Sequence, residues 1–186
     1  MIMWLILALA VIALLWIIVS YNRLISLKNQ TINGWKQIDV QLKRRHDLIP
    51  NLVETVKGAM SFEQTTLTKV IEARNKAISA SGVAAKAQEE NALTGALRQL
   101  FALVENYPDL KSNTNVLQFQ EELSSTENKI GFARQFYNDI ATQFNISQQV
   151  FPTNIIANMF GFKASELFEV TDASEREVPK VDLSIK

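Results

Sequence analysis

Residues 2–19 read IMWLILALAVIALLWIIV, and every one of them is hydrophobic. As an α-helix that rises about 1.5 Å per residue, this run spans most of a hydrocarbon core about 30 Å thick. A buried core helix normally keeps a polar face, and a cleavable signal peptide begins with positive charges and ends at a small-residue cleavage site. Neither pattern is present, so the sequence predicts a transmembrane helix over residues 1–21, with the lipid bilayer as a partner.

All charged side chains follow this run, and their distribution predicts an orientation. The 186 residues hold 19 basic and 19 acidic side chains, and the first charge is Arg23. Residues 23–46 contain six basic residues and one acidic residue. The positive-inside rule therefore predicts an N-terminus outside and a cytoplasmic domain in the cell membrane. A periplasmic domain is the alternative, because several of these cations also fit a folded helix.

Beyond residue 22, apolar residues recur at intervals of three and four, which is typical of amphipathic helices. Helices are predicted from the membrane to about residue 58, then over 62–79, 84–105 and 114–145, with a short helix at 155–160. Four helices with short connections favour a mostly antiparallel bundle over residues 22–164. The predicted fold class is therefore all-α, with a transmembrane helix that runs into the bundle. The acidic residues 165–186 are predicted to form an exposed, poorly ordered tail.

Two prolines mark expected irregularities. Pro50 removes the hydrogen bond to the carbonyl of His46, which predicts a helix kink there or a new helix start with Asp47 as its cap. The segment 105–113 holds Pro108 among turn-forming residues and is predicted to be a loop. The residues of this loop predicted to contact a protein partner are Asn106, Tyr107, Pro108 and Asp109.

Four charged residues occupy positions where the helical pattern predicts apolar side chains. They are Arg45, Arg74, Glu127 and Arg134. A buried guanidinium is costly unless a carboxylate pairs with it, and Glu127 is a candidate partner by its place in the pattern. One interpretation is an internal polar network that fixes helix register, or simple snorkelling of long side chains. The other is a recessed pocket that binds an anion.

The composition excludes much common chemistry. The chain has no cysteine and one histidine, which excludes disulfides, thiolate zinc sites and sites that need two imidazoles. His46 is predicted to be solvated or to cap a helix, and Glu89 and Glu90 are predicted to lie on a solvated helix face. Phosphate loops, HExxH and GxSxG motifs are absent from the sequence, and the basic cluster 43–45 is too short for a nucleic-acid surface. No catalytic residue, metal site, cofactor or nucleic-acid partner is predicted.

The segment QLKRRHDLIPNLVE, residues 41–54, closely resembles the signature of the LemA family of bacterial membrane proteins. The resemblance extends from residue 5 to about 168 and includes Glu72-Ala73-Arg74, residues 105–111, Glu127-Asn128, Ala133-Arg134, Tyr137-Asn138 and Asn145. Small departures occur at Ala59 and Phe62, where the family commonly has tyrosine and often histidine. The resemblance implies one N-terminal membrane helix and a helical bundle, without an established enzymatic activity or cofactor.

Binding is therefore favoured over catalysis. The predicted function is a membrane-anchored scaffold or adaptor that binds other membrane proteins at the bacterial cell membrane. The resemblance suggests a membrane protease or an envelope complex as the partner. The alternatives are a self-assembling homo-oligomer that shapes the membrane or maintains the envelope, and a ligand-sensing module with an Arg/Glu-lined pocket.

Overall fold

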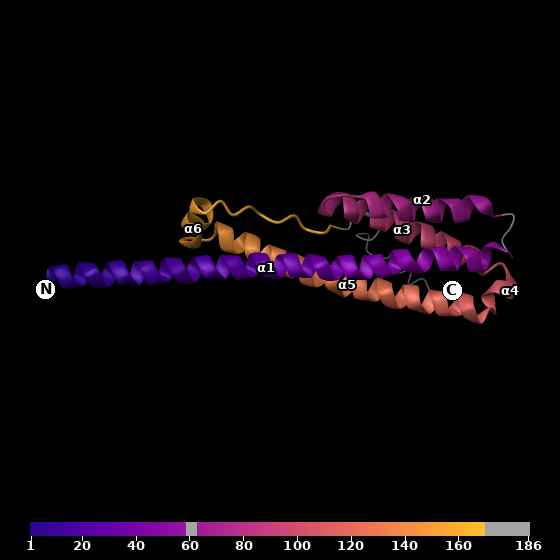
Figure 1. The fold of residues 1–186 in the computed structure, drawn as a ribbon, viewed down its shortest axis with the longest axis horizontal. Helices are drawn as coiled ribbons and strands as arrows, with labels where there is room; N and C mark the ends of the chain where they lie inside the picture. The colour runs from indigo at the N-terminus through magenta and orange to yellow at the C-terminus, as the bar shows by residue number, and fades with distance from the viewer. Residues whose placement is uncertain (59–62, 170–186) are drawn as a thin grey trace, which may run out of the picture.

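The computed structural model describes residues 1–58 and 63–169, and its regular elements are helices (Figure 1). They are α1 (Ile2–Lys57), α2 (Gln64–Ser79), α3 (Val83–Val104), α4 (Pro108–Lys111), α5 (Thr114–Gln149) and α6 (Thr153–Met159). No strand occurs in the described part of the chain. The predicted all-α fold class is confirmed.

The four long helices alternate in direction and form an antiparallel bundle (Figure 1). With 56 residues, α1 is about 84 Å long. Its middle and far end pack along α5, and the α2–α3 hairpin covers the end of the bundle that lies far from the N-terminus (Figure 1). The short helix α6 lies at the opposite end, beside α1. The predicted bundle with one short additional C-terminal helix is confirmed.

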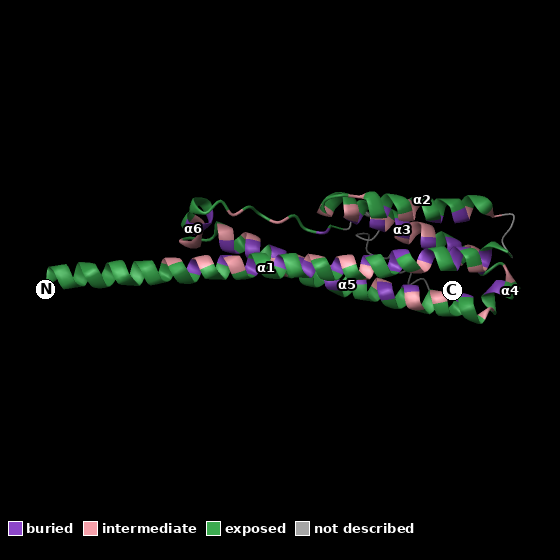
Figure 2. Ribbon diagram, viewed as in Figure 1, coloured by how far each residue is buried: buried purple, intermediate pink, exposed green. Residues whose placement is uncertain are grey.

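The apolar N-terminal part of α1 projects from the bundle without cover. Residues 1–16 are exposed, and burial along α1 begins only where α5 and α6 reach it (Figure 2). Among the described residues, α1 is the one helix long and apolar enough to cross a membrane. A core helix of a soluble domain would be buried over such a window, whereas none of this one is.

Pro50 lies inside α1, which continues unbroken to Lys57. The predicted helix start with Asp47 as its cap is therefore wrong, and Asp47 instead accepts a hydrogen bond from Lys43 Nζ at 2.7 Å. The helix continues because the turns on both sides of Pro50 are held in the core by Ile49, Leu52, Val53 and Val56, all buried. The kink at Pro50 stays a prediction.

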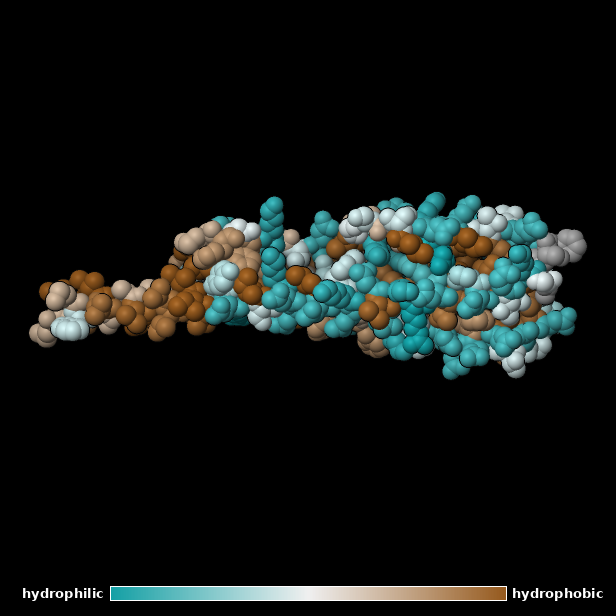
Figure 3. Space-filling view, in the orientation of Figure 1, coloured by the Kyte–Doolittle hydropathy of each residue, from teal (hydrophilic) through white to brown (hydrophobic). Residues whose placement is uncertain are grey.

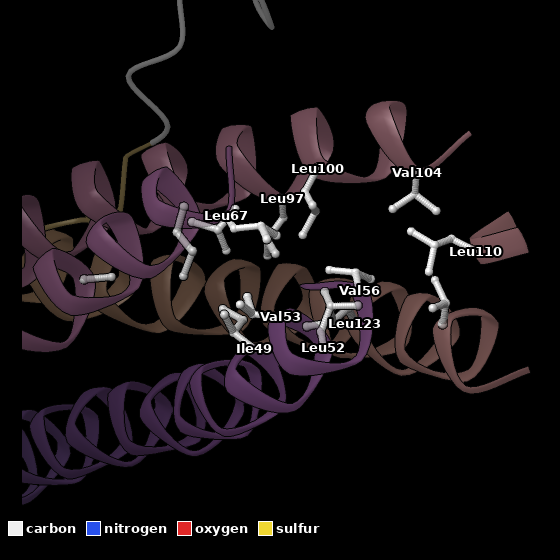
Figure 4. Packing of buried hydrophobic residues seen from close by; sticks show 14 residues of the cluster. Ile49, Leu52, Val53, Val56, Leu67, Leu97, Leu100, Val104, Leu110 and Leu123 are labelled. Carbon is white, nitrogen blue, oxygen red and sulfur yellow. The ribbon is translucent and has the colours of Figure 1, made fainter. Parts of the chain in front are cut away.

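The core at the far end of the bundle contains buried residues of α1, α2, α3, α4 and α5, and several of them are labelled in Figure 4. Ile49, Leu52, Val53 and Val56 of α1 meet leucines and valines of α2, α3, α4 and α5, such as Leu67, Leu100, Leu110 and Leu123. Leu110 belongs to α4, a single helical turn within the segment predicted to be a loop. Pro108 at the first position of this turn supplies a helical φ, and burial of Leu110 holds the turn in place.

The segment after α6 runs back along α5 in extended conformation to Glu169 (Figure 1). Phe168 is 2% exposed and belongs to the middle core cluster, together with Ile38, Ala87 and Tyr137. The prediction that the chain is exposed from residue 165 is therefore wrong for Phe168. Its ring is buried against residues of α1, α3 and α5 that lie far away in the sequence, so the local charge pattern does not indicate this burial. Residues 170–186 of the predicted tail lie outside the described residues.

Candidate functional site

Arg45 joins three helices from the centre of the bundle. Its side chain is 2% exposed on α1. Nη1 donates to Glu127 Oε2 of α5 at 2.5 Å and to Thr94 Oγ1 of α3 at 2.9 Å. Nη2 donates to the carboxylate of Glu90 on α3. These hydrogen bonds connect α1 to α3 and α5 and fix the position of each helix along the bundle axis relative to the others.

Glu90 and His46 complete this network, and both predictions about them are wrong. Glu90 is 2% exposed, and its Oε1 lies 2.9 Å from Nε2 of the buried His46. Adjacent residues on a helix point about 100° apart, so Glu89 stays partly exposed while Glu90 enters the core. The adjacent glutamates therefore differ: the carboxylate of Glu90 is buried, whereas that of Glu89 is partly exposed to solvent. Arg45, His46, Glu90 and Glu127 are called the polar network below.

Arg74 explains how α1 tolerates Pro50. Its Nε donates to the carbonyl oxygen of His46 at 2.7 Å. This is the carbonyl that would accept from the backbone N–H of residue 50, which proline lacks. The guanidinium of α2 therefore replaces the missing helical hydrogen bond and adds a positive charge beside the network.

Arg134 lies apart from the polar network. Its guanidinium carbon is 4.4 Å from the ring centroid of Phe168, a cation–π contact. Of the four charged residues singled out in the sequence, the structure therefore brings Arg45 and Glu127 into direct contact. It connects Arg74 through a backbone carbonyl, and it places Arg134 over the C-terminal segment.

Two asparagines of α5 bind the C-terminal segment as an extended strand is bound in a sheet. Asn138 Nδ2 donates to the Phe168 carbonyl at 3.0 Å, and its Oδ1 accepts from the Phe168 N–H at 2.8 Å. Asn145 binds the backbone N–H and carbonyl of Ser165 in the same way, both at 2.8 Å. Between them, the Tyr137 hydroxyl donates to the carbonyl of Glu166 at 2.7 Å. The sequence reasoning missed this contact, although Tyr137-Asn138 and Asn145 were among the motifs that carried the family resemblance.

The predicted partner loop is only partly available to a partner. Asn106, Pro108 and Asp109 are exposed, whereas Tyr107 is half-buried against the core of the far end. The Tyr107 hydroxyl donates to Glu63 Oε1 at 3.4 Å. Desolvation and the nearby Glu63 carboxylate raise the pKa of Tyr107 above its ordinary value. A role of this loop in partner binding stays a prediction.

A cavity of about 220 Å³ opens beside Arg45 and is lined by residues that include Arg98, Phe101 and Glu127. Arg45 also lines this cavity, but its guanidinium already pairs with the carboxylates of Glu90 and Glu127, so its charge is compensated without a bound anion. The geometry thus favours a structural network over an anion pocket. Within residues 1–58 and 63–169, no cluster of three or more potential ligand side chains could hold a metal ion.

The balance of forces on Glu90 gives the network a pH dependence. Burial alone would raise the pKa of Glu90, but the hydrogen bond from His46 and the charge and hydrogen bonds of Arg45 lower it below the ordinary value of 4.5. A lowered pKa in the folded state means that the ionised carboxylate stabilises the fold above the unfolded-state pKa. That contribution is lost as the pH falls through the folded-state pKa.

The substitution Glu90→Gln is expected to lower the free energy of unfolding by about 2 kcal/mol at pH 7, because Arg45 and His46 lose a charged acceptor. The difference from the natural chain should narrow as the pH falls below 4.5. Urea titrations between neutral and acidic pH measure it. The matched control is Glu89→Gln, whose partly exposed side chain should change stability little at any pH. A difference that stays constant into acid would contradict the assignment.

An apolar groove lies between α1 and α5 on the surface of the bundle. It encloses about 550 Å³ and is lined by Val40, Phe132 and Phe136, with Lys36 and Lys129 beside them. Phe132 is 74% exposed and Val40 64% exposed. This set of five residues is called the α1–α5 groove below. Large apolar side chains therefore gather on one exposed face of the bundle.

An uncovered apolar helix that continues into a helical bundle defines a membrane-associated helical protein. The LemA family pattern matches residues 34–183. The chain is 34% identical over 166 residues to "Protein LemA" of Metamycoplasma hominis, covering 83% of this chain and 74% of that protein. It is also 25% identical over 188 residues to "Magnetosome protein MamQ 2" of Paramagnetospirillum magneticum, which covers 87% of this chain and 69% of that protein. The chain belongs to the LemA family, and the family resemblance seen in the sequence is confirmed.

Proposed function

We propose that this protein is a membrane-anchored scaffold or adaptor that binds another membrane protein through the α1–α5 groove. The exposed Phe132 and Val40 carry this proposal, because burying them against a partner removes apolar surface from water. The names of the relatives describe no enzymatic activity, which supports a role in binding over catalysis.

The surroundings of the groove define the chemistry of the partner. Lys36 and Lys129 line it, and neither forms an ion pair with any residue that the structure describes. A partner helix with apolar residues on one face and carboxylates at its edges would satisfy both features. Lys36 lies 15 residues beyond Tyr21, about 22 Å along the helix. The partner segment therefore belongs to the membrane-proximal soluble part of a membrane protein.

Photocrosslinking in native membranes tests this proposal. A photoreactive amino acid at Phe132 should yield one discrete adduct with a membrane protein. The double variant Lys36→Glu, Lys129→Glu should reduce that adduct by at least about tenfold, since two attractive contacts become repulsive. The matched control places the probe at Ile78 on α2, which is 48% exposed and apolar but lies outside the groove.

The adaptor proposal fails if probes at Phe132 and Ile78 give the same adducts, or if the lysine reversal leaves the Phe132 adduct unchanged. An adduct with a second copy of this chain would instead favour the self-assembling oligomer. Sizing of the detergent-solubilised protein as a large discrete particle would support that outcome independently.

We further propose the orientation with the bundle in the cytoplasm. The six basic residues that follow the membrane helix support it. Because the chain contains no cysteine, a single Ser112→Cys variant reports the location of the far end of the bundle. A membrane-impermeant maleimide is expected to label it only after cell lysis. Labelling of intact spheroplasts would instead place the bundle outside the cytoplasm.

A further inference from the structure

We infer that the end of the bundle that carries α6 is a second membrane contact. In this inference α6 and the turn before it lie in the interface of the bilayer that α1 crosses, with Phe151, Ile155 and Met159 against the acyl chains. The inference rests on the proposed membrane anchoring by α1 and adds a lipid-binding surface on the folded domain.

The first argument is the height of α6 along α1. Its buried face packs against Leu24 and Leu27, in a cluster that Ile17 and Tyr21 also join. The ring of Phe160 lies 4.6 Å from the ring of Tyr21, measured between centroids. A helix needs about 20 residues to cross the hydrocarbon core, so a span that begins near Ile2 ends near Tyr21. Ile17 then lies about 6 Å inside that boundary.

The second argument is the absence of charge at this end of the bundle. Residues 140–162 contain no Asp, Glu, Lys or Arg, and this uncharged stretch is bounded by Asp139 and Lys163. The α1 helix likewise carries no charged side chain before Arg23. Two segments far apart in the sequence therefore lose their charges at the same end of the molecule. The hydrocarbon of a bilayer penalises charged side chains that enter it, whereas water does not.

The third argument is a pair of apolar faces on one short helix. Ile156 and Ala157 are each 2% exposed and hold α6 on the bundle. On the other side of α6, Met159 is 67% exposed and Ile155 is 50% exposed, and Phe151 in the preceding turn is 80% exposed. The apolar surface of this region is continuous with that of the membrane helix (Figure 3). A soluble partner would have to share this space with lipid, because α1 brings the bilayer to the same height.

The chemistry of the exposed residues fits the bilayer interface. Large apolar side chains can enter the acyl boundary, while uncharged polar groups such as Thr153 and Asn158 suit the headgroup layer. Contact at two separate points, α1 and α6, would fix the tilt of the bundle over the membrane. The α1–α5 groove would then have a fixed orientation relative to the bilayer surface.

Site-directed spin labelling tests this inference in the full chain. Single cysteines replace Met159 or Phe151, and the labelled proteins are reconstituted into vesicles of phosphatidylcholine and phosphatidylglycerol. Collision rates with oxygen, which concentrates in lipid, are compared with those of a water-soluble nickel chelate. Labels at Met159→Cys and Phe151→Cys are expected to show an oxygen preference several-fold above that of Ser112→Cys at the far end.

Two further labels separate the possible failures. Leu9→Cys reports the membrane helix, and Ile78→Cys reports an exposed apolar position away from the membrane. If Leu9 is shielded from nickel but Met159 and Phe151 are as accessible as Ser112, α6 does not contact lipid and the inference is overturned. If Leu9 is accessible too, α1 does not cross the bilayer and the anchoring falls with it. Equal shielding of Ile78 and Met159 would indicate protein association and overturn the lipid contact.

Discussion

Replacement of Arg45 by methionine is expected to lower the free energy of unfolding of the bundle by about 3–5 kcal/mol. Methionine fills much of the same volume but leaves the buried carboxylate of Glu90 without its guanidinium partner. Glu127 and Thr94 also lose their donor on Arg45. The cost is large because the buried Glu90 carboxylate then keeps only its hydrogen bond to His46, without water or the guanidinium to compensate its charge.

Urea unfolding of the detergent-solubilised chain, followed by circular dichroism, measures this loss. Lys43→Met is the matched control, since Lys43 lies on the same helix and pairs with Asp47 at 2.7 Å but is 76% exposed. An exposed pair of this kind contributes at most about 1 kcal/mol. Adding Glu90→Leu to Arg45→Met should recover part of the loss, because the stranded charge is removed. Equal losses for Arg45→Met and Lys43→Met would contradict a buried network.

Phe168→Ala is expected to release the C-terminal segment from α5 and to lower stability by about 3 kcal/mol. The ring packs against Trp35, with centroids 6.0 Å apart, and lies under the guanidinium of Arg134. Its removal leaves a cavity beside Tyr137, and the hydrogen bonds from Asn138, Asn145 and Tyr137 must then hold the extended chain without the buried ring. Because the loss can be relieved by local detachment, the segment should open before the bundle unfolds.

Hydrogen exchange measures this opening directly. The backbone N–H groups of Ser165 and Phe168, which donate to Asn145 and Asn138, should exchange much faster in Phe168→Ala. Leu167→Ala is the control. The Leu167 side chain neighbours Phe168 in the sequence but is exposed, so its removal should leave the protection of these N–H groups intact. Unchanged protection in Phe168→Ala would show that the side-chain hydrogen bonds of α5 hold the segment without the ring.

The helices themselves could be predicted closely from the apolar spacing. The buried positions of α1, such as Leu24, Ile38, Leu42 and Ile49, follow the intervals read from the sequence. The apolar N-terminal part of α1, long enough to cross a membrane, could be predicted from eighteen uninterrupted apolar residues. The charged position at Arg45 was recognised too, because it broke a regular apolar pattern. Each of these features depends on residues within a few turns of one another.

Features that depend on contacts between distant helices could not be predicted. Glu90 lies 45 residues from Arg45 in the chain, and its sequence neighbourhood is that of a solvated helix face. The repair of Pro50 by Arg74 spans 28 residues from His46 to α2. The docking of Phe168 likewise needs Trp35 of α1 and Tyr137 of α5, which come together only when these helices pack.

The amino-acid sequence therefore specified the long apolar N-terminal helix, the all-α class and the order of helices, because helical periodicity and hydrophobic length are local properties of the chain. The packed structure alone selected Glu90 as the buried partner of Arg45, left Phe132 exposed and placed α6 beside the point on α1 where its uncovered apolar part ends. Those choices depend on the rotation and height of each helix relative to its neighbours. The rotation and height of one helix depend on the side chains of all the helices packed against it, so they are not a local property of its own sequence.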